Sequence, residues 1–190
     1  KKMTENRDKF ELGIAVQKVH DFIWDEFCDW YVEIAKYRIY HAEEDSQSAN
    51  CALWVLKTVL GQALKLLHPF MPFITEEIYG ALVPEEESLM MSSWPVYRED
   101  WKFPYATEVI EHVKAITRGI RNMRAEMNVP NNKRTKVYII SSDSKLLTAL
   151  EALKESVKPL MLANDIILHY EKKDVADDAA VSYTHLTLPT

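Results

Sequence analysis

The sequence predicts a mainly α-helical protein, built as a helical bundle that is followed by a small α+β module. Only 4 glycines stand against 5 tryptophans, 9 tyrosines and 6 phenylalanines, a composition poor in tight turns and rich in large packing residues. Apolar residues recur at steps of 3 and 4 over much of the chain, which is the spacing of one helix face. The second half alternates helical and β-branched segments, as in α+β folds.

A first long helix is predicted over residues 12–38. Its apolar face comprises Leu12, Val16, Val19, Ile23, Phe27, Trp30 and Ile34. The aromatic residues that would widen this buried face are Phe22, Trp24 and Tyr31. Lys36 and Arg38 follow near the helix end, where positive charge suits the negative pole of the helix dipole. Helical core spacing also predicts that Trp24, Trp30 and, in the next helix, Trp54 are packing residues.

Prolines delimit the next two helices. A helix with leucines at positions 53, 56, 60, 64 and 67 should end at His68, because Pro69 disfavours helical geometry in the residue before it. Pro72 suits the first turn of a short helix with the sequence FITEEIYGAL. These helices and the first one form part of a bundle.

The remaining elements alternate in type. Residues 83–104 contain three prolines and no usable period, so they are expected to form an ordered crossing loop. An amphipathic helix follows, with Val109, Val113, Ile116, Ile120, Met123 and Met127 on one face. The segments KRTKVYIIS and DIILHY predict two strands, and between them a helix should run from about Lys145 to Pro159.

Three parts result from this pattern. Residues 1–100 are the bundle with its crossing loop and 101–172 are the helix with the small α/β module. Residues 173–190 are a linker and a tail, VSYTHLTLPT, that is expected to be foreign or disordered. The chain starts in mid-pattern, so we expect a fragment of a longer protein whose first bundle helices are missing.

A cationic segment interrupts a chain of formal net charge −6. Its six cations, here called the basic strip, are Arg118, Arg121, Arg124, Lys133, Arg134 and Lys136. A solvated face whose arginine stems cover apolar surface is one interpretation. The other is a contact with the phosphates of RNA, because Lys114 and the three arginines share one helix arc that carries no acid at i+4 to pair them. Charge alone leaves both open.

No catalytic or metal site is predicted. Glu76 and Glu77 are adjacent, so their side chains point about 100° apart on a helix and suit its positive end better than a shared substrate. His68 has no second ligand beside it, and Cys28 and Cys51 do not form a metal-binding pair, so a core histidine and reduced thiols are favoured. No uncharged run is long enough to span a bilayer, and we expect no membrane partner.

Four segments in this order resemble valyl-tRNA synthetases. They are FIWDEFCDWYVEIAKYRIY, LLHPFMPFITEEIYGAL, SSWP and AITRGIRNMRAEMNVPNNKRTKVYI. The resemblance runs from about Phe10 to about Ile167, and it is to the region after the catalytic domain. HPFMPFITEEIY alone indicates only the valine, isoleucine and leucine enzymes of class I, whereas FCDWYVEIAK and IRNMRAEMNVP indicate the valine enzyme.

The resemblance implies an anticodon-binding helical bundle of the class I synthetase type. Its parent would be a cytoplasmic ligase that attaches valine to valine-specific tRNA with ATP. The nucleotide-binding signatures and the editing domain of the family are absent here, so the resemblance implies an inactive piece without a cofactor of its own. Its partners would be tRNA and the catalytic and editing domains of the same polypeptide.

Charge alone selects the candidate RNA contacts, which are the six cations of the basic strip and, more weakly, Lys36 and Arg38. The strip would meet either the tRNA backbone or the absent catalytic domain, and both partners suit arginine. A second hypothesis is a structural bundle that packs on other domains without touching RNA. A free-standing hydrolase or metalloenzyme is disfavoured because no acid, base, nucleophile or ligand set converges.

Overall fold

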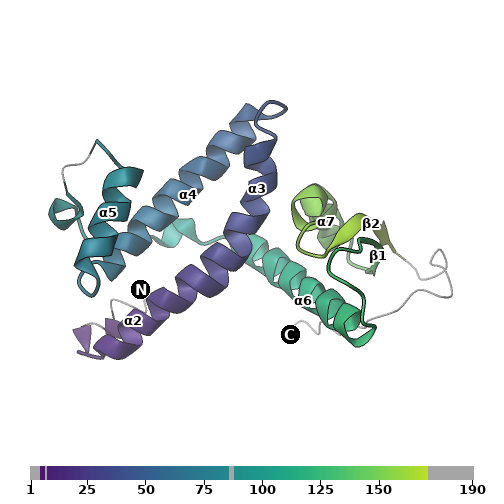
Figure 1. The fold of residues 1–190 in the computed structure, drawn as a ribbon, viewed down its shortest axis with the longest axis horizontal. Helices are drawn as coiled ribbons and strands as arrows, with labels where there is room; N and C mark the ends of the chain where they lie inside the picture. The colour runs from purple at the N-terminus through teal and green to yellow at the C-terminus, as the bar shows by residue number, and fades with distance from the viewer. Residues whose placement is uncertain (1–4, 7, 86–87, 171–190) are drawn as a thin grey trace. The chain divides into compact units, whose positions relative to one another are not determined.

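The computed structural model describes residues 5, 6, 8–85 and 88–170. They belong to two compact units, Lys1–Trp101 and Lys102–Thr190. Helices account for most of the described chain and one two-stranded sheet accompanies them, which confirms the predicted fold class (Figure 1). The predicted linker and tail at 173–190 lie outside the described residues.

The first unit begins with a continuous helical rod. It runs from α2 (Leu12–Asp21) through η1 (Phe22–Val32) into α3 (Glu33–Tyr40). The predicted long helix is therefore present, but its middle segment has the wider π-helical pattern, in which hydrogen bonds join residues i and i+5. Apolar steps of 3 and 4 residues do not distinguish the two patterns over so few turns, so the sequence does not indicate the change.

Helix α4 (Ser46–Leu67) returns along the rod and packs on α2 and α3 (Figure 1). The Asp45 carboxylate caps its first turn by accepting a hydrogen bond from the Ser48 amide at 2.9 Å. Its last helical residue precedes His68, as predicted. The buried positions of α4 are mostly small and include Ala49, Ala52 and Gly61, so the neighbouring backbones can approach closely.

Helix α5 (Pro72–Leu82) packs against α4 and begins at Pro72, as predicted. Leu64, Tyr79, Val83 and Leu89 form the core between the two helices. The crossing loop that follows contains only two short 3-10 turns within its described residues, η2 (Leu89–Met91) and η3 (Glu99–Trp101).

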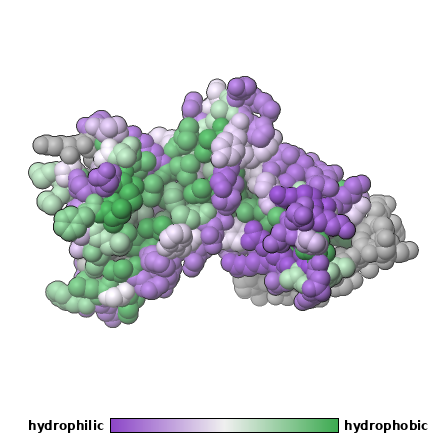
Figure 2. Space-filling model, viewed as in Figure 1, coloured by the Kyte–Doolittle hydropathy of each residue, from purple (hydrophilic) through white to green (hydrophobic). Residues whose placement is uncertain are grey.

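The core placement predicted for three tryptophans is correct for only one. Trp30 is 7% exposed, whereas Trp24 is 56% and Trp54 is 61% exposed. Phe22, expected to widen the buried face, is exposed as well. The spacing of apolar residues shows that a helix has an apolar face, but it does not show whether another helix covers that face. In the described chain, the face of α4 that is buried carries mostly small residues. Figure 2 shows the resulting hydrophobic surface on the first unit.

The second unit contains α6 (Pro104–Glu126), β1 (Thr135–Ile140), α7 (Ser144–Val157) and β2 (Ala163–His169). Each element matches a predicted one. The strands pair in parallel, with Val137 opposite Ile166, and α7 is the crossover between them. Met161, Ile166 and Val157 are almost fully buried and form the centre of this unit.

Candidate nucleic-acid interface

The basic strip lies in the second unit, on the last turns of α6 and on the turn that leads into β1. Five of its six members are at least partly exposed: Arg118, Arg121, Lys133, Arg134 and Lys136. Arg124 is the exception, because only 7% of its surface is exposed. Charge alone selects six cations on the strip, and the structure separates them into a buried one and an exposed set.

Both terminal nitrogens of Arg124 are hydrogen-bonded within the protein, whereas its Nε atom is buried without a hydrogen-bond partner among the described residues. Its Nη2 atom donates hydrogen bonds to the carbonyl oxygens of Pro130 at 3.0 Å and Lys133 at 2.6 Å, and its Nη1 atom donates to Thr135 Oγ1 at 3.1 Å. The guanidinium therefore fixes the turn between α6 and β1. Its burial and these hydrogen bonds distinguish Arg124 from the five exposed cations of the strip.

Arg121 and Arg134 are tied to the connection between α7 and β2. Arg121 Nε donates to the Leu160 carbonyl at 3.0 Å, and Arg134 Nη1 lies 3.5 Å from the Pro159 carbonyl. Both side chains nevertheless remain exposed. These contacts orient the guanidinium groups, and the other nitrogens of Arg121 have no hydrogen bond to the described residues.

Four cations of the exposed set keep their charge uncompensated. Arg121, Lys133, Arg134 and Lys136 form no ion pair with any carboxylate in the described chain. Lys114, which shares their helix, differs because it is buried and its ammonium lies 2.8 Å from Glu111 Oε1. The sequence argument considered only acids at i+4, and the partner of Lys114 stands three residues before it.

Lys36 and Arg38 belong to the first unit, and both have local partners. Lys36 Nζ lies 2.6 Å from Glu33 Oε1, and this hydrogen bond raises the pKa of Lys36 above its ordinary value. Arg38 donates to Ser48 Oγ at 2.7 Å and to the Ser48 carbonyl at 2.9 Å, which connects α3 to α4. These contacts give the two side chains roles in the bundle itself.

A hollow that the sequence does not indicate adjoins the strip. It has a volume of about 360 Å³ and is lined by Arg121, Arg124, Ala125, Val129, Asn131 and Leu162. Asn131 and Leu162 are far apart in sequence and neither carries charge, so no local pattern could have singled them out. The parallel pairing of β1 and β2 brings the residue before β2 next to the turn after α6, since the Thr135 amide donates to the Leu162 carbonyl at 3.4 Å.

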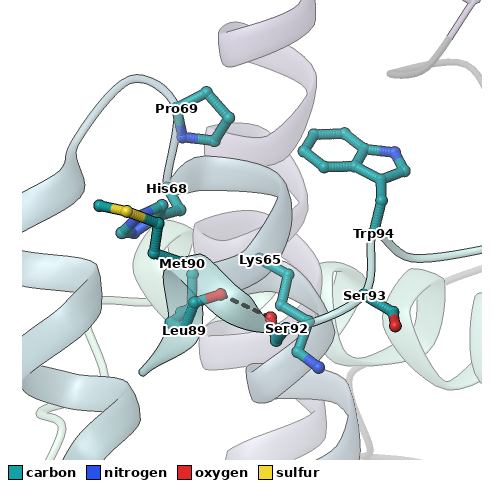
Figure 3. A pocket seen from close by; sticks show the side chains of 8 residues that line it. All are labelled: Lys65, His68, Pro69, Leu89, Met90, Ser92, Ser93 and Trp94. Atoms are coloured by element: carbon teal, nitrogen blue, oxygen red, sulfur yellow. Dashed lines mark hydrogen bonds between the residues drawn. The ribbon is translucent and has the colours of Figure 1, made fainter. Parts of the chain in front are cut away.

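A second hollow, in the first unit, joins two of the segments that carry the resemblance (Figure 3). Its lining is Lys65, His68, Pro69, Leu89, Met90, Ser92, Ser93 and Trp94, around about 190 Å³. Thr75 Oγ1 donates to the Met71 carbonyl at 2.7 Å, and His68 Nδ1 lies 2.8 Å from the same hydroxyl oxygen. The proton of the hydroxyl is used at Met71, so His68 Nδ1 is the donor to Thr75. His68 thus has the structural role that the sequence favours.

Glu76 caps the short 3-10 turn beside this hollow. The Ser88 hydroxyl is the main cause that lowers the pKa of Glu76, and the Leu89 amide, which donates to Glu76 Oε1 at 2.9 Å, adds to it. The ionised carboxylate of Glu76 therefore connects α5 to the crossing loop. The neighbouring Glu77 is exposed.

The depressed pKa predicts a pH dependence of stability. The ionised Glu76 contributes stability above the unfolded-state value of 4.5, and this contribution is lost as the pH falls through the lower folded-state pKa. The free energy of unfolding, measured with urea, should fall as the pH decreases from about 5 to about 3. We expect this decrease to be smaller for Glu76→Gln than for the wild type. Glu77→Gln is the matched control and should leave the profile unchanged. Superimposable profiles for the wild type and Glu76→Gln would contradict this account.

The described residues provide neither a metal site nor a membrane span. No three histidine, cysteine, aspartate or glutamate side chains lie close enough together there to hold a metal ion. None of the described helices combines the length and the apolar character needed to cross a bilayer.

Comparison with known protein families gives one match over most of the chain. Residues 1–139 match the family described as the anticodon-binding domain of tRNA ligase. The matched range contains α2 to α6, most of β1 and the whole basic strip. Leu162 of the hollow lies beyond it.

Individual relatives extend further along the chain. The valine–tRNA ligase of Clostridium perfringens is 48% identical over 143 residues, which cover 75% of this chain and 16% of that enzyme. The valine–tRNA ligase of Clostridium acetobutylicum is 40% identical over 184 residues, 97% of this chain and 20% of the enzyme. That of Oceanobacillus iheyensis is 35% identical over 189 residues, 98% and 21% respectively. The chain thus spans about a fifth of the length of the curated relatives it matches.

Proposed function

The chain belongs to the anticodon-binding domain family of tRNA ligases, and from this premise we propose that it is the tRNA-binding part of a valine–tRNA ligase. It would position valine tRNA for ATP-dependent valylation by a catalytic part that the chain does not contain. The similarity to valine–tRNA ligases over nearly the whole chain supports the choice of amino acid. The observation that carries the proposal of direct RNA contact is the set of strip cations that form no ion pair within the described residues, Arg121, Lys133, Arg134 and Lys136.

The exposed members of the strip suit the RNA backbone rather than the bases. Arginine and lysine neutralise phosphates without reading sequence, so their contribution is electrostatic and depends on salt. Tethering of Arg121 to the Leu160 carbonyl limits the freedom that its side chain would lose on binding. We therefore assign backbone contacts to Arg118, Arg121, Lys133, Arg134 and Lys136, and we exclude the buried Arg124.

A salt titration of binding to valine tRNA tests the proposal. We expect Arg118→Gln/Lys133→Gln/Lys136→Gln to weaken binding, and the salt dependence of log K to become shallower by about 0.9 for each duplex phosphate that is no longer neutralised. Removing all three cations should lower affinity by roughly one to two orders of magnitude at moderate salt. The measurement is filter binding with valine tRNA and with a non-cognate tRNA.

The control removes the same charge elsewhere. Lys18→Gln/Lys57→Gln/Lys145→Gln takes three cations from other surfaces and should leave the salt slope close to that of the wild type. If both triple variants behave alike, the strip contributes only net charge and no defined contact. Unchanged binding in the strip variant would instead assign its cations to docking within the parent enzyme, which is the alternative that the family match does not favour.

The remaining parts of the proposal concern the parent enzyme. ATP would be used only by its catalytic part, and this chain would need no cofactor. The catalytic and editing domains of the same polypeptide would be its protein partners. A cytoplasmic location remains a prediction from the sequence.

A further inference from the structure

We propose that the hollow beside the basic strip, lined by Arg121, Arg124, Ala125, Val129, Asn131 and Leu162, is a binding site for one unpaired nucleotide of RNA. This inference rests on the proposed function, because it gives that function a defined subsite. The hollow adds one property to the proposed function. The strip alone would contact any phosphate backbone, whereas a hollow that takes a base distinguishes unpaired from paired RNA.

The hollow has the chemistry of a nucleotide site. Ala125, Val129 and Leu162 supply apolar walls, on which the face of a base can lie. Arg121 supplies guanidinium nitrogens for a phosphate, and Asn131 supplies an exposed amide that can both donate and accept at a base edge. No acidic residue lines the hollow, so nothing in its lining repels a phosphate. Its volume of about 360 Å³ lies within the range of small-molecule sites.

The walls are fixed before any ligand arrives. Arg124 holds the turn through the carbonyls of Pro130 and Lys133, and the Val129 amide donates to the Arg124 carbonyl at 2.9 Å. Arg121, which also lines the hollow, is held by its hydrogen bond to the Leu160 carbonyl. Both guanidinium groups thus serve the shape of the hollow. A site whose walls need no reordering loses less entropy when a ligand binds.

Two substitutions test the site without touching these supports. Asn131→Ala removes the amide, and Ala125→Leu fills the hollow from the last turn of α6 with a residue that favours helices. Asn132→Ala is the matched control, since Asn132 is the exposed neighbour of Asn131 and does not line the hollow. None of the three removes a cation.

The experiment uses the full chain and two probes. The first is a titration with each nucleoside monophosphate, and with inorganic phosphate, followed by the NMR shifts of the Asn131 side-chain amide and the Leu162 backbone amide. We expect at least one monophosphate to shift both signals, inorganic phosphate to shift neither to the same extent, and Ala125→Leu to abolish the response. Equal responses to monophosphates and to phosphate would overturn the proposal, since the base would then contribute nothing.

The second probe is a labelled single-stranded RNA compared with a duplex of the same length. We expect Asn131→Ala to weaken single-strand binding about tenfold, the effect of removing a two-point interaction with a base edge, with little change for the duplex. Asn132→Ala should bind both RNAs as the wild type does. Single-strand binding by Asn131→Ala and Ala125→Leu at the wild-type level would reject the hollow while leaving backbone binding to tRNA intact. Failure of the wild type to bind tRNA at all would reject the proposed function as well, so the two failures are distinguishable.

Discussion

Arg124→Ala is expected to lower the free energy of unfolding of the second unit by about 3 kcal/mol or more. The substitution removes a guanidinium that is 7% exposed and donates to two carbonyls and one hydroxyl. Each hydrogen bond to a charged group contributes about 1.5–3 kcal/mol, and the acceptors left behind lose their partner inside the turn. The turn between α6 and β1 should therefore loosen together with the start of β1.

Urea unfolding followed by far-UV circular dichroism, with amide hydrogen exchange to locate the change, measures this effect. Arg118→Ala is the matched control, because Arg118 lies on the same helix but is exposed, and its removal should cost no more than about 0.5 kcal/mol. Arg124→Lys should recover little, since an ammonium cannot reproduce the planar fork that reaches three acceptors. If Arg124→Ala and Arg118→Ala have the same midpoint, the buried contacts do not stabilise the unit.

Tyr79→Ala is expected to destabilise the first unit by about 3–5 kcal/mol, the range for truncating a large buried aromatic side chain. Tyr79 is 3% exposed and lies in the core with Leu64, Val83 and Leu89. The Lys65 ammonium lies 5.4 Å from the centre of its ring, which adds a cation–π contact.

Tyr79→Phe separates the ring from its hydroxyl group. It keeps the packed ring and should cost no more than about 1.5 kcal/mol. The urea midpoints of the two variants, with hydrogen exchange of the α4 and α5 amides, provide the comparison. Equal destabilisation by Tyr79→Phe and Tyr79→Ala would show that the hydroxyl group, rather than the packing of the ring, is the source of the stability.

The helices and strands were predictable because their boundaries depend on local chemistry. Pro69 and Pro72 mark the end of α4 and the start of α5, since proline restricts the residue before it and lacks a donor. The period of the apolar residues indicates α6, and the β-branched run indicates β1. None of these inferences needs knowledge of which elements meet in space.

What could not be predicted depends on tertiary contacts. Arg124 resembles the other cations of the strip in sequence, and only the fold of the turn after α6 buries it. Trp24 and Trp54 stand at core spacing, yet neither is covered in the described unit. Asn131 and Leu162 both line the hollow, although α7, the crossover between the two parallel strands, lies between them in the sequence. No local sequence pattern extends over such a separation.

The division into two units has a spectroscopic consequence. All five tryptophans, Trp24, Trp30, Trp54, Trp94 and Trp101, precede residue 102 and so belong to the first unit. Intrinsic indole emission therefore monitors the helical bundle selectively, with the buried Trp30 and the exposed Trp24 and Trp54 emitting from different environments. The second unit contains no tryptophan, so an indole signal reports on the first unit and not on the unit that carries the basic strip.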